Sequence, residues 1–573
     1  MNEEHYGPKQ PFSKELHQTK YRSKGESFKE SMSRIANALK DDDEHYKDFR
    51  DILLNMRFLP AGRVQSAMGA ARRVTPYNCF VSRTIPDSMS GIMGALAEAA
   101  ETMRMGGGIG YDFSTLRPRG DLIRSLDSKS SGSLSFMGIF DALCSTISSS
   151  GHRRGAQMGV LRVDHPDIEE FIHAKQNKTS LTQFNISVGV TNDFMYAVKH
   201  SLPFDLKFEG RVYKTVDAAM LWEEIMRSTW EWAEPGILFI DQINKMNNLS
   251  YCERIVATNP CGEQPLPPYG ACLLGSFNLC AYIKENLNGD YWFDWDTFEE
   301  DIPVVVRAQD NIVDRATYPL TEQEAEAKSK RRMGLGFAGL ANASEVQGWA
   351  YGSRDMLAFT HKVCEVLANE AYMASAMLAK EKGSFPLFEK NRYLASPFIK
   401  TLSPIVQEAI GLYGIRNSHL TSTAPTGTIS LCADNISSGV EPVWSYEYDR
   451  IVQTFEGPTT QKVKDYGWAT WGVKGRLATQ CTAKEHLDVL IAVTQHMDSA
   501  VSKTCNVSPD MPWDEFKELY MIAWESGCKG ITTFNPSGSR FGILEAPSLD
   551  EPEDFVEGGA CFIDPETGMK ECA

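Results

Sequence analysis

Three residues capable of chemistry alternate along the stretch NPCGEQPLPPYGAC, residues 259–272: the amide Asn259, the thiol Cys261 and the carboxylate Glu263. In an extended segment the side chains at i and i+2 face the same side, so we expect these three to point into one pocket. The run PLPPYG predicts a rigid return that brings Cys272 back toward the same region. Such a set could bind and deprotonate a polyol. A hydrolytic thiol would need a histidine partner, and none lies nearby in sequence.

The same residues also have simpler interpretations, because a buried cysteine is usually a packing residue and Asn-Pro is usually a turn. In STAPTGTISLCADNISSG (422–439), small donors precede what could be a helix. Backbone amides at a helix start bind phosphate well, but an ordinary helix cap explains them equally. We keep both interpretations open at this point.

Two further motifs are rejected as ligand sites. MGGGIGYDF (105–113) follows a helix and precedes a strand, the reverse of a dinucleotide-binding fingerprint, so its glycines are expected to serve a turn. HPDIEEFIH (165–173) has the wrong histidine spacing for a metalloprotease motif and is read as a capped helix start. We expect no metal site.

The composition bounds the class of protein. Of 573 residues, 42% are hydrophobic, which is enough for a large core, and no apolar run long enough for a membrane span occurs. The polar N-terminus is not a signal peptide. The net charge of −17 argues against a nucleic-acid surface. The 13 cysteines are scattered without the spacing of a disulfide scaffold, so most are expected to be free thiols in a reducing, cytoplasmic setting. No CxxC pair occurs, which makes a zinc ribbon an unsuitable reading.

The elements that must position these residues fall into three regions. Residues 1–50 predict a small helical region, with Ser27 capping a helix and Glu30 completing a capping box. Residues 51–544 alternate strands and helices, which is typical of an α/β domain. Examples are helices at 90–105 and 355–383 and strands at 185–191 and 236–241. Residues 545–573 are acidic and rich in Pro and Gly, and predict a flexible tail that nevertheless carries Cys561 and Cys572.

Several short segments together resemble the ribonucleotide reductase catalytic subunit, most closely the class II, adenosylcobalamin-dependent form. They are FLPAGR (58–63), NCF (78–80), GGGIGYDFSTLRPRG (106–120), GHRRGAQMGVLRVDHPDIEEFI (151–172), NPCGEQPL (259–266), RRMGLGFAGLAN (331–342), TAPTGTIS (423–430) and KGITTFNPSGSR (529–540). The resemblance covers nearly all of the chain after about residue 50. It implies a ten-stranded α/β barrel, made of two five-stranded halves, with a finger loop at its centre.

The resemblance also implies roles for individual residues. Cys261 would become a thiyl radical that abstracts the ribose 3′-hydrogen, with Glu263 as the base and Asn259 bonded to the ribose hydroxyls. Cys79 and Cys272 would supply the reducing equivalents and close to a disulfide in each turnover. The tail thiols of Cys561 and Cys572 would reduce that disulfide by exchange. Their separation is wider than the close pair usual in the family.

Binding sites follow from the same resemblance. Substrate phosphates would lie at a helix N-terminus formed by Thr426, Gly427, Thr428 and Ser430. A deoxynucleoside triphosphate effector would bind at a homodimer interface through Asp87, Arg117, Arg119, Arg124 and Lys178, with Lys178 in a loop (176–183) that links effector base to substrate base. A thioredoxin or glutaredoxin-type protein would be the external reductant. Since only 78 residues precede Cys79, we expect no N-terminal ATP-cone domain.

The radical source is inferred from what the chain lacks. The class I form receives its radical through a tyrosine pair from a metal-containing subunit, and this chain has no Tyr-Tyr pair, with Phe534 where relatives often have tyrosine. We therefore predict a ribonucleoside-diphosphate reductase that uses adenosylcobalamin. The alternatives are a catalytic subunit that binds no cofactor and takes its radical from a partner subunit, and a non-catalytic nucleotide-binding regulator. Intact Cys261, Glu263 and Asn259 argue against the regulator.

Overall fold

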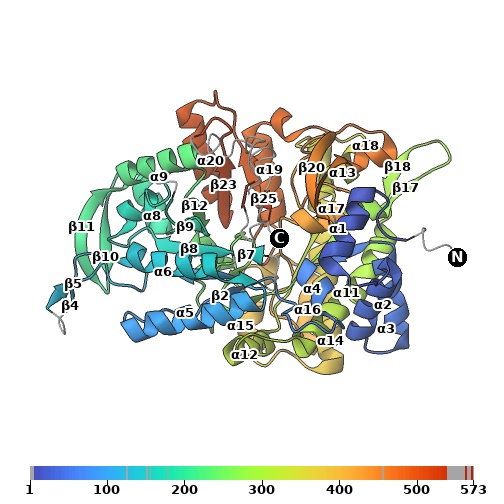
Figure 1. The fold of residues 1–573 in the computed structure, drawn as a ribbon, viewed down its shortest axis with the longest axis horizontal. Coiled ribbons are helices and arrows are strands. Elements are labelled where there is room, and N and C mark those ends of the chain that lie inside the picture. The colour runs from blue at the N-terminus through green and yellow to red at the C-terminus, as the bar shows by residue number, and fades with distance from the viewer. Residues whose placement is uncertain are drawn as a thin grey trace.

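The structure is a computed structural model of the chain and describes residues 6–123, 127–149, 153–154, 156–176, 179–454, 457–538, 562–563 and 570–571. Figure 1 shows its N-terminal helices on one side and the first run of strands on the other. No helix among the described residues is long and apolar enough to cross a membrane.

Three helices open the chain: α1 (Pro11–Tyr21), α2 (Phe28–Leu39) and α3 (Asp43–Leu54). The predicted capping box is confirmed, since the Ser27 side chain accepts from the Glu30 amide and the Glu30 carboxylate accepts from the Ser27 amide. The apolar faces of these helices belong to the same buried cluster as the strands that follow. The N-terminal helices are therefore packed onto the main body and share its core.

A first set of parallel strands runs β2, β3, β8, β9 and β12 in sheet order. Parallel neighbours need a crossover, and helices supply it here. The strands are β2 (Cys79–Val81), β3 (Gly108–Asp112), β8 (Gln157–Arg162), β9 (Phe184–Val190) and β12 (Gly236–Phe239). The connecting helices are α5 (Met89–Arg104), α6 (Ser133–Thr146), α7 (Ile168–Ile172), α8 (Asn192–Lys199) and α9 (Ala218–Trp232), and the hairpin β10 (Pro203–Phe208) and β11 (Arg211–Asp217) precedes α9.

A second set of strands occupies the later half of the chain. Its strands are β15 (Ala271–Cys272), β16 (Leu274–Asn278), β19 (Gly334–Ala338), β22 (Thr504–Asn506) and β23 (Gly530–Phe534). Its larger helices are α11 (Trp295–Arg315), α12 (Thr321–Lys330), α13 (Leu340–Glu345), α14 (Arg354–Lys382), α16 (Pro404–Tyr413), α17 (Gly427–Cys432), α19 (Ala483–Thr494) and α20 (Trp513–Glu525). The hairpin β20 (Glu447–Thr454) and β21 (Gly457–Lys464) and the helix α18 (Tyr466–Trp471) lie between α17 and α19.

The two sets meet through antiparallel contacts. β23 pairs with β12, and β15 pairs with β2, each antiparallel. The hydrogen-bonded ladders form an eight-stranded sheet, β15-β2-β3-β8-β9-β12-β23-β22, and a separate three-stranded sheet, β1-β16-β19, in which β1 is Phe58–Pro60. The prediction of ten strands in one closed ladder is therefore not confirmed. Leu273 interrupts the strand between β15 and β16, and residues 421–423 pair through isolated bridges only.

Most of the elements predicted from local patterns are confirmed. The predicted helices at 90–105 and 355–383 correspond to α5 and α14, and the strand at 185–191 corresponds to β9. The strand predicted at 236–241 is wrong at its end, because α10 (Ile240–Met246) begins at Ile240. The glycine-rich segment is a turn only at Gly106, whose φ is +96°, whereas Gly108 and Gly110 lie inside β3.

Candidate active site

The stretch around Cys261 is the tip of a short hairpin. β13 (Ala257–Thr258) pairs antiparallel with β14 (Pro265–Leu266), and residues 259–264 form the loop between them. The loop closes on itself through the Asn259 amide, which donates to the Gln264 carbonyl at 3.1 Å. Gly262 has a φ of +83°, which a glycine adopts without the steric cost that a side chain would bring. The expectation of an extended segment is therefore wrong here, because the loop 259–264, which we call the finger, makes a turn.

The hairpin passes directly over the first set of strands. A Cβ on Gly110 of β3 would lie 1.8 Å from the Thr258 carbonyl oxygen, so only glycine permits this approach. The Asn185 side chain of β9 donates to the Pro260 carbonyl at 3.1 Å. Asn259, Cys261 and Glu263 are all buried. The finger loop thus lies within the molecule, with β3 and β9 beneath it.

Two distant segments hold the Glu263 backbone. The Ser422 hydroxyl and the Ala500 amide both donate to the Glu263 carbonyl, each at 2.9 Å. Beside them, the Asn259 Oδ1 accepts from the Gln264 amide at 2.9 Å. Within the described part of the chain, the buried Asn259 Nδ2 has no hydrogen-bond partner. An amide donor left in this way is suited to a ligand oxygen, because a buried polar group without a partner is destabilising.

Cys79 and Cys272 are direct neighbours across the ladder between β2 and β15. Cα atoms of antiparallel register partners lie about 4.5–5.5 Å apart, which is within the range that a disulfide spans. Neither residue is in a disulfide in this structure. Burial raises the pKa of the Cys272 thiol well above its usual value, and the nearby Glu263 and Cys79 raise it further. The bend predicted for PLPPYG does bring Cys272 close to Glu263.

Cys79 also faces the finger. A Cβ on Gly108 would meet both the Cys79 Sγ at 3.2 Å and the Pro260 ring at 3.3 Å, so these two groups lie on the same side of β3. Cys261 itself is disulfide-bonded in this structure. Cys261 must therefore be reduced before its sulfur can do thiol chemistry.

The segment that follows Ser422 reaches α17. Thr426 precedes the helix with a φ of +59°, and its hydroxyl bonds to the Ser430 hydroxyl at 2.8 Å and accepts from the Gly439 amide at 2.7 Å. These two hydroxyls are therefore occupied within the loop. The first amides of any helix lack intrahelical acceptors, which leaves the backbone at Gly427 and Thr428 as the more available donors.

A row of polar side chains follows Ala500, whose amide donates to the Glu263 carbonyl, and leads into β22. Ser502 Oγ, Thr504 Oγ1 and Asn506 Oδ1 are enclosed and have no partner among the described residues. Because strand side chains alternate, Thr504 and Asn506 share one face of β22, and Ser502 lies two residues before the strand begins. The Thr423 hydroxyl and the Asn535 amide nitrogen are enclosed and unpartnered in the same way. Sequence reasoning missed this row, although the period of two in SKTCN could have revealed it.

The predicted effector residues separate into two places. The Arg117 guanidinium pairs with the Asp87 carboxylate at 2.7 Å, beside the start of α5. Arg119 instead forms a bidentate pair with Glu170 and also donates its amide to Asp167. Arg124 and Lys178 lie outside the described residues.

The tail residues Cys561 and Cys572 also lie outside the described residues. The short strands β24 (Phe562–Ile563) and β25 (Lys570–Glu571) pair antiparallel, and β25 lies beside α17. No group of three or more metal-ligating side chains was found in the part of the chain that the structure describes.

Comparison with known proteins adds the family. Residues 77–466 and 475–534 match the model of the ribonucleotide reductase barrel domain. A vitamin B12-dependent ribonucleoside-diphosphate reductase of Mycobacterium tuberculosis (strain H37Rv) is 35% identical over 566 residues, covering 92% of this chain and 77% of that protein. A protein of the same name from Thermoplasma acidophilum is 31% identical over 561 residues, covering 92% and 70%. A vitamin B12-dependent ribonucleotide reductase of Streptomyces clavuligerus is 26% identical, covering 83% and 58%.

Proposed function

Because this chain belongs to the ribonucleotide reductase family, we propose that it converts ribonucleoside diphosphates to 2′-deoxyribonucleoside diphosphates with adenosylcobalamin as its cofactor. The observation that carries the proposal is the register pairing of Cys79 with Cys272 next to the buried Glu263. Two thiols that can close to a disulfide are a two-electron reductant, and a carboxylate beside them is a base. Such a pair has no evident use in a protein that only binds nucleotides.

In the proposed reaction, reduced Cys261 carries a thiyl radical that removes the ribose 3′-hydrogen. Glu263 takes the 3′-hydroxyl proton, and the Asn259 Nδ2 binds a ribose hydroxyl. The 2′-hydroxyl leaves as water after a proton from the thiol pair, and Cys79 and Cys272 become a disulfide. Overall, one ribonucleotide and two thiols give one deoxyribonucleotide, one disulfide and one water. Cys79 would supply the proton to the departing 2′-hydroxyl, and the raised pKa of its partner Cys272 keeps that second thiol protonated until the disulfide forms.

The enclosed polar side chains without hydrogen-bond partners allow a test of whether the cofactor fits this protein. Adenosylcobalamin offers many amide, hydroxyl and ring-nitrogen groups, so it suits a wall of uncharged donors and acceptors. Ser502, Thr504, Asn506 and Asn535 form such a set in and next to the paired strands β22 and β23, and they are our candidates for holding it. When bound, the cofactor supplies the one-electron oxidation needed at Cys261. The burial of the finger keeps solvent from that sulfur.

The ten-stranded barrel remains part of the proposal. Five parallel strands, β2, β3, β8, β9 and β12, would face a second five made of β16, β19, residues 421–423, β22 and β23. The bridges Leu335 to Thr421 and Thr423 to Val501 support closure across the second half. We also propose the division into a helical region (1–50), the barrel (51–544) and a redox tail (545–573).

The remaining assignments complete the proposal. Substrate phosphates would lie on the amides of Gly427 and Thr428, with Thr426 and Ser430 shaping the loop. A deoxynucleoside triphosphate would bind beside Asp87 and Arg117 at a homodimer interface formed by α5 and α6, with Arg119, Arg124 and Lys178 as further candidate contacts. Cys561 and Cys572 would pass electrons from a thioredoxin or glutaredoxin-type protein. A cytoplasmic location is proposed because these thiols need a reducing compartment.

The decisive experiment measures deoxynucleoside diphosphate formation by this chain alone with dithiothreitol, with and without adenosylcobalamin. We expect product only with the cofactor, none from Cys261→Ser, and normal activity from Cys252→Ser, a matched change at an exposed cysteine. Activity restored only by an added metal-containing subunit would favour the partner-dependent alternative. Full activity of Cys261→Ser would refute the radical assignment.

A further inference from the structure

We propose that the N-terminal helix α1 positions the segment carrying α17, with Asp434 as the positioning residue that α1 holds. This inference rests on the proposed phosphate site at α17. It gives the N-terminal helices a part in substrate binding, although they lie far from the finger in sequence.

Asp434 lies two residues beyond the end of α17 and receives the start of the chain. Its carboxylate accepts from the Lys9 amide at 2.7 and 2.8 Å, and from the Gln10 amide at 2.7 Å. The Gln10 side chain donates in return to the Asp434 carbonyl at 2.8 Å. Asp434 is 4% exposed, whereas Lys9 is exposed, so these bonds are partly buried. Hydrogen bonds to a buried carboxylate are among the stronger ones in proteins.

The backbone makes a sharp turn at the point where these contacts are formed. Asp434 and Asn435 have φ values of +61° and +58°, in the left-handed region that side chains other than glycine seldom adopt. Two consecutive residues in that region turn the chain sharply as it leaves α17. Asp and Asn adopt this region more readily than other non-glycine residues, and the contacts with residues 9–10 hold the turn that they make.

A second contact reaches α17 itself. The buried Ser13 hydroxyl of α1 donates to the Leu431 carbonyl at 2.6 Å. The last carbonyls of a helix have no intrahelical donor, so Ser13 satisfies one of them. α1 thus holds both the final turn of α17 and the residues that follow it.

Apolar packing also joins these helices, since Phe12 and Leu16 of α1 lie in one buried cluster with Ile429 of α17. A small cavity of about 10 Å³, room for about one water, lies there and is lined by His17, Phe28, Ile429 and Cys432 among others. Burial and the neighbouring Arg22 lower the pKa of His17 to about 3, so this side chain is neutral and adds no ion pair. The polar contacts of Ser13 and Asp434 therefore add to the apolar packing that holds α17 against α1.

Movement of α17 would be felt at the finger. The same segment begins at Ser422, whose hydroxyl binds the Glu263 carbonyl, and it is closed by the bond from the Gly439 amide to Thr426. Loss of the Asp434 contacts should loosen the proposed phosphate-binding residues at the start of α17 before it affects the finger. The Glu263 carbonyl keeps its second donor, the Ala500 amide. The expected signature is weaker binding of the phosphates with little change in kcat.

The test compares Asp434→Asn and Ser13→Ala with the parent chain. Glu15→Gln is the matched control, since Glu15 lies on the same helix but bonds to Gln461 of β21. CDP binding is measured by calorimetry, cytidine serves as the phosphate-free probe, and hydrogen exchange is followed in residues 427–432. We expect about tenfold weaker CDP binding for Asp434→Asn, a smaller loss for Ser13→Ala, unchanged cytidine binding and faster exchange in both variants.

Three outcomes would overturn the inference: parent-like CDP affinity in Asp434→Asn, an equal loss for cytidine, or unchanged exchange across 427–432. Should Asp434→Asn not fold, Ser13→Ala alone decides by the same criteria. A parent-like result for Glu15→Gln is required for support, and an equal defect there would also count against the inference. Failure of the parent chain to bind CDP at all would refute the proposed function itself, which is a different result.

Discussion

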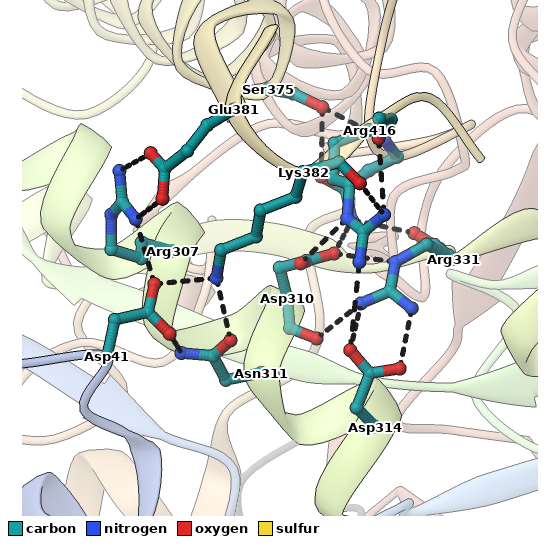
Figure 2. A network of polar contacts seen from close by, with 12 residues as sticks. Asp41, Arg307, Asp310, Asn311, Asp314, Arg331, Ser375, Glu381, Lys382 and Arg416 are labelled. Carbon is teal, nitrogen blue, oxygen red and sulfur yellow. Dashed lines mark hydrogen bonds and ion pairs between the residues drawn. The ribbon is translucent and has the colours of Figure 1, made fainter. Parts of the chain in front are cut away.

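The charge network shown in Figure 2 predicts a large difference between two similar substitutions, Asp310→Asn and Asp314→Asn. Both carboxylates receive Arg331: Asp310 accepts from its Nε at 2.9 Å, and Asp314 accepts from both terminal nitrogens at 2.8 Å. Asp310 also accepts from Arg416 at 3.1 Å and from Asn417 at 2.8 Å. The Asp310 side chain is 0% exposed and that of Asp314 is 48% exposed.

Burial decides the magnitudes. Asp310→Asn leaves two guanidinium groups facing a new N–H donor in the interior, and breaking a buried ion pair from one side costs about 3–5 kcal/mol of unfolding free energy. Asp314→Asn removes a pair screened by solvent, which contributes about 1 kcal/mol or less. If these contacts are lost in the unfolding transition state, the unfolding rate should rise roughly 10²- to 5 × 10³-fold for Asp310→Asn and about fivefold for Asp314→Asn.

Pulse proteolysis at a fixed urea concentration measures these unfolding rates directly. The rate is the proper quantity here, because a chain of 573 residues is not expected to unfold in one reversible step. Unfolding rates for the two variants within about threefold of each other would refute the burial argument. Asn417 also donates to the Arg331 carbonyl at 3.0 Å, next to β19. The folded fraction of Asp310→Asn should therefore also have a lower turnover rate than the parent.

Three further predictions concern the finger, the thiol pair and a buried acid. Gly110→Ala should lower kcat by about 10²-fold, because its Cβ must displace the Thr258 backbone. Gly411→Ala, in α16 with only a 3.9 Å contact, should be harmless, and a similar loss there would contradict the reasoning. In a single turnover, the reduced parent enzyme should lose two of its thiols for each deoxynucleotide formed, whereas Cys272→Ser should lose none. Titration of the free thiols measures this difference. Burial raises the pKa of Glu345 from 4.5 to about 7, so the folded state holds this proton more tightly than the unfolded state does. Stability should therefore fall as pH rises from about 4.5 to 7, by roughly 3 kcal/mol at most. Glu345→Gln should unfold more slowly than the parent at pH 8 but not at pH 4.5, and parallel pH profiles of the unfolding rate in pulse proteolysis would exclude this.

Local signals predicted the elements well. The capping box at Ser27 and the helical period of α5 and α14 depend on neighbours within one or two turns, which the sequence displays directly. The end of β12 was missed because Ile240 suits a strand as well as a helix. In the fold, the Asp241 carboxylate accepts from the Asn192 amide at 2.7 Å at the start of α8, a contact that the local pattern does not reveal.

Long-range contacts explain the rest. Gly110 was expected to serve a turn, but it lies within β3 because the finger crosses there. The alternation of Asn259, Cys261 and Glu263 suggested an extended segment, yet the bond from the Asn259 amide to the Gln264 carbonyl closes a turn. The pairing of Cys79 with Cys272 joins residues far apart in the chain, and the family resemblance implied it where spacing could not.

The finger motif does not fix its own geometry. The Glu263 carbonyl is held by Ser422 and Ala500, which lie more than a hundred residues further along the chain. Beyond Gln264, a Cβ on Gly334 of β19 would lie 2.3 Å from the Gln264 Nε2, so that strand also constrains the loop. A short hairpin with two-residue strands has little stability of its own. The base and the thiols can therefore act together only when the second set of strands is folded behind them. A substitution that weakens the contacts between the second set of strands and the finger should reduce turnover before it unfolds the protein.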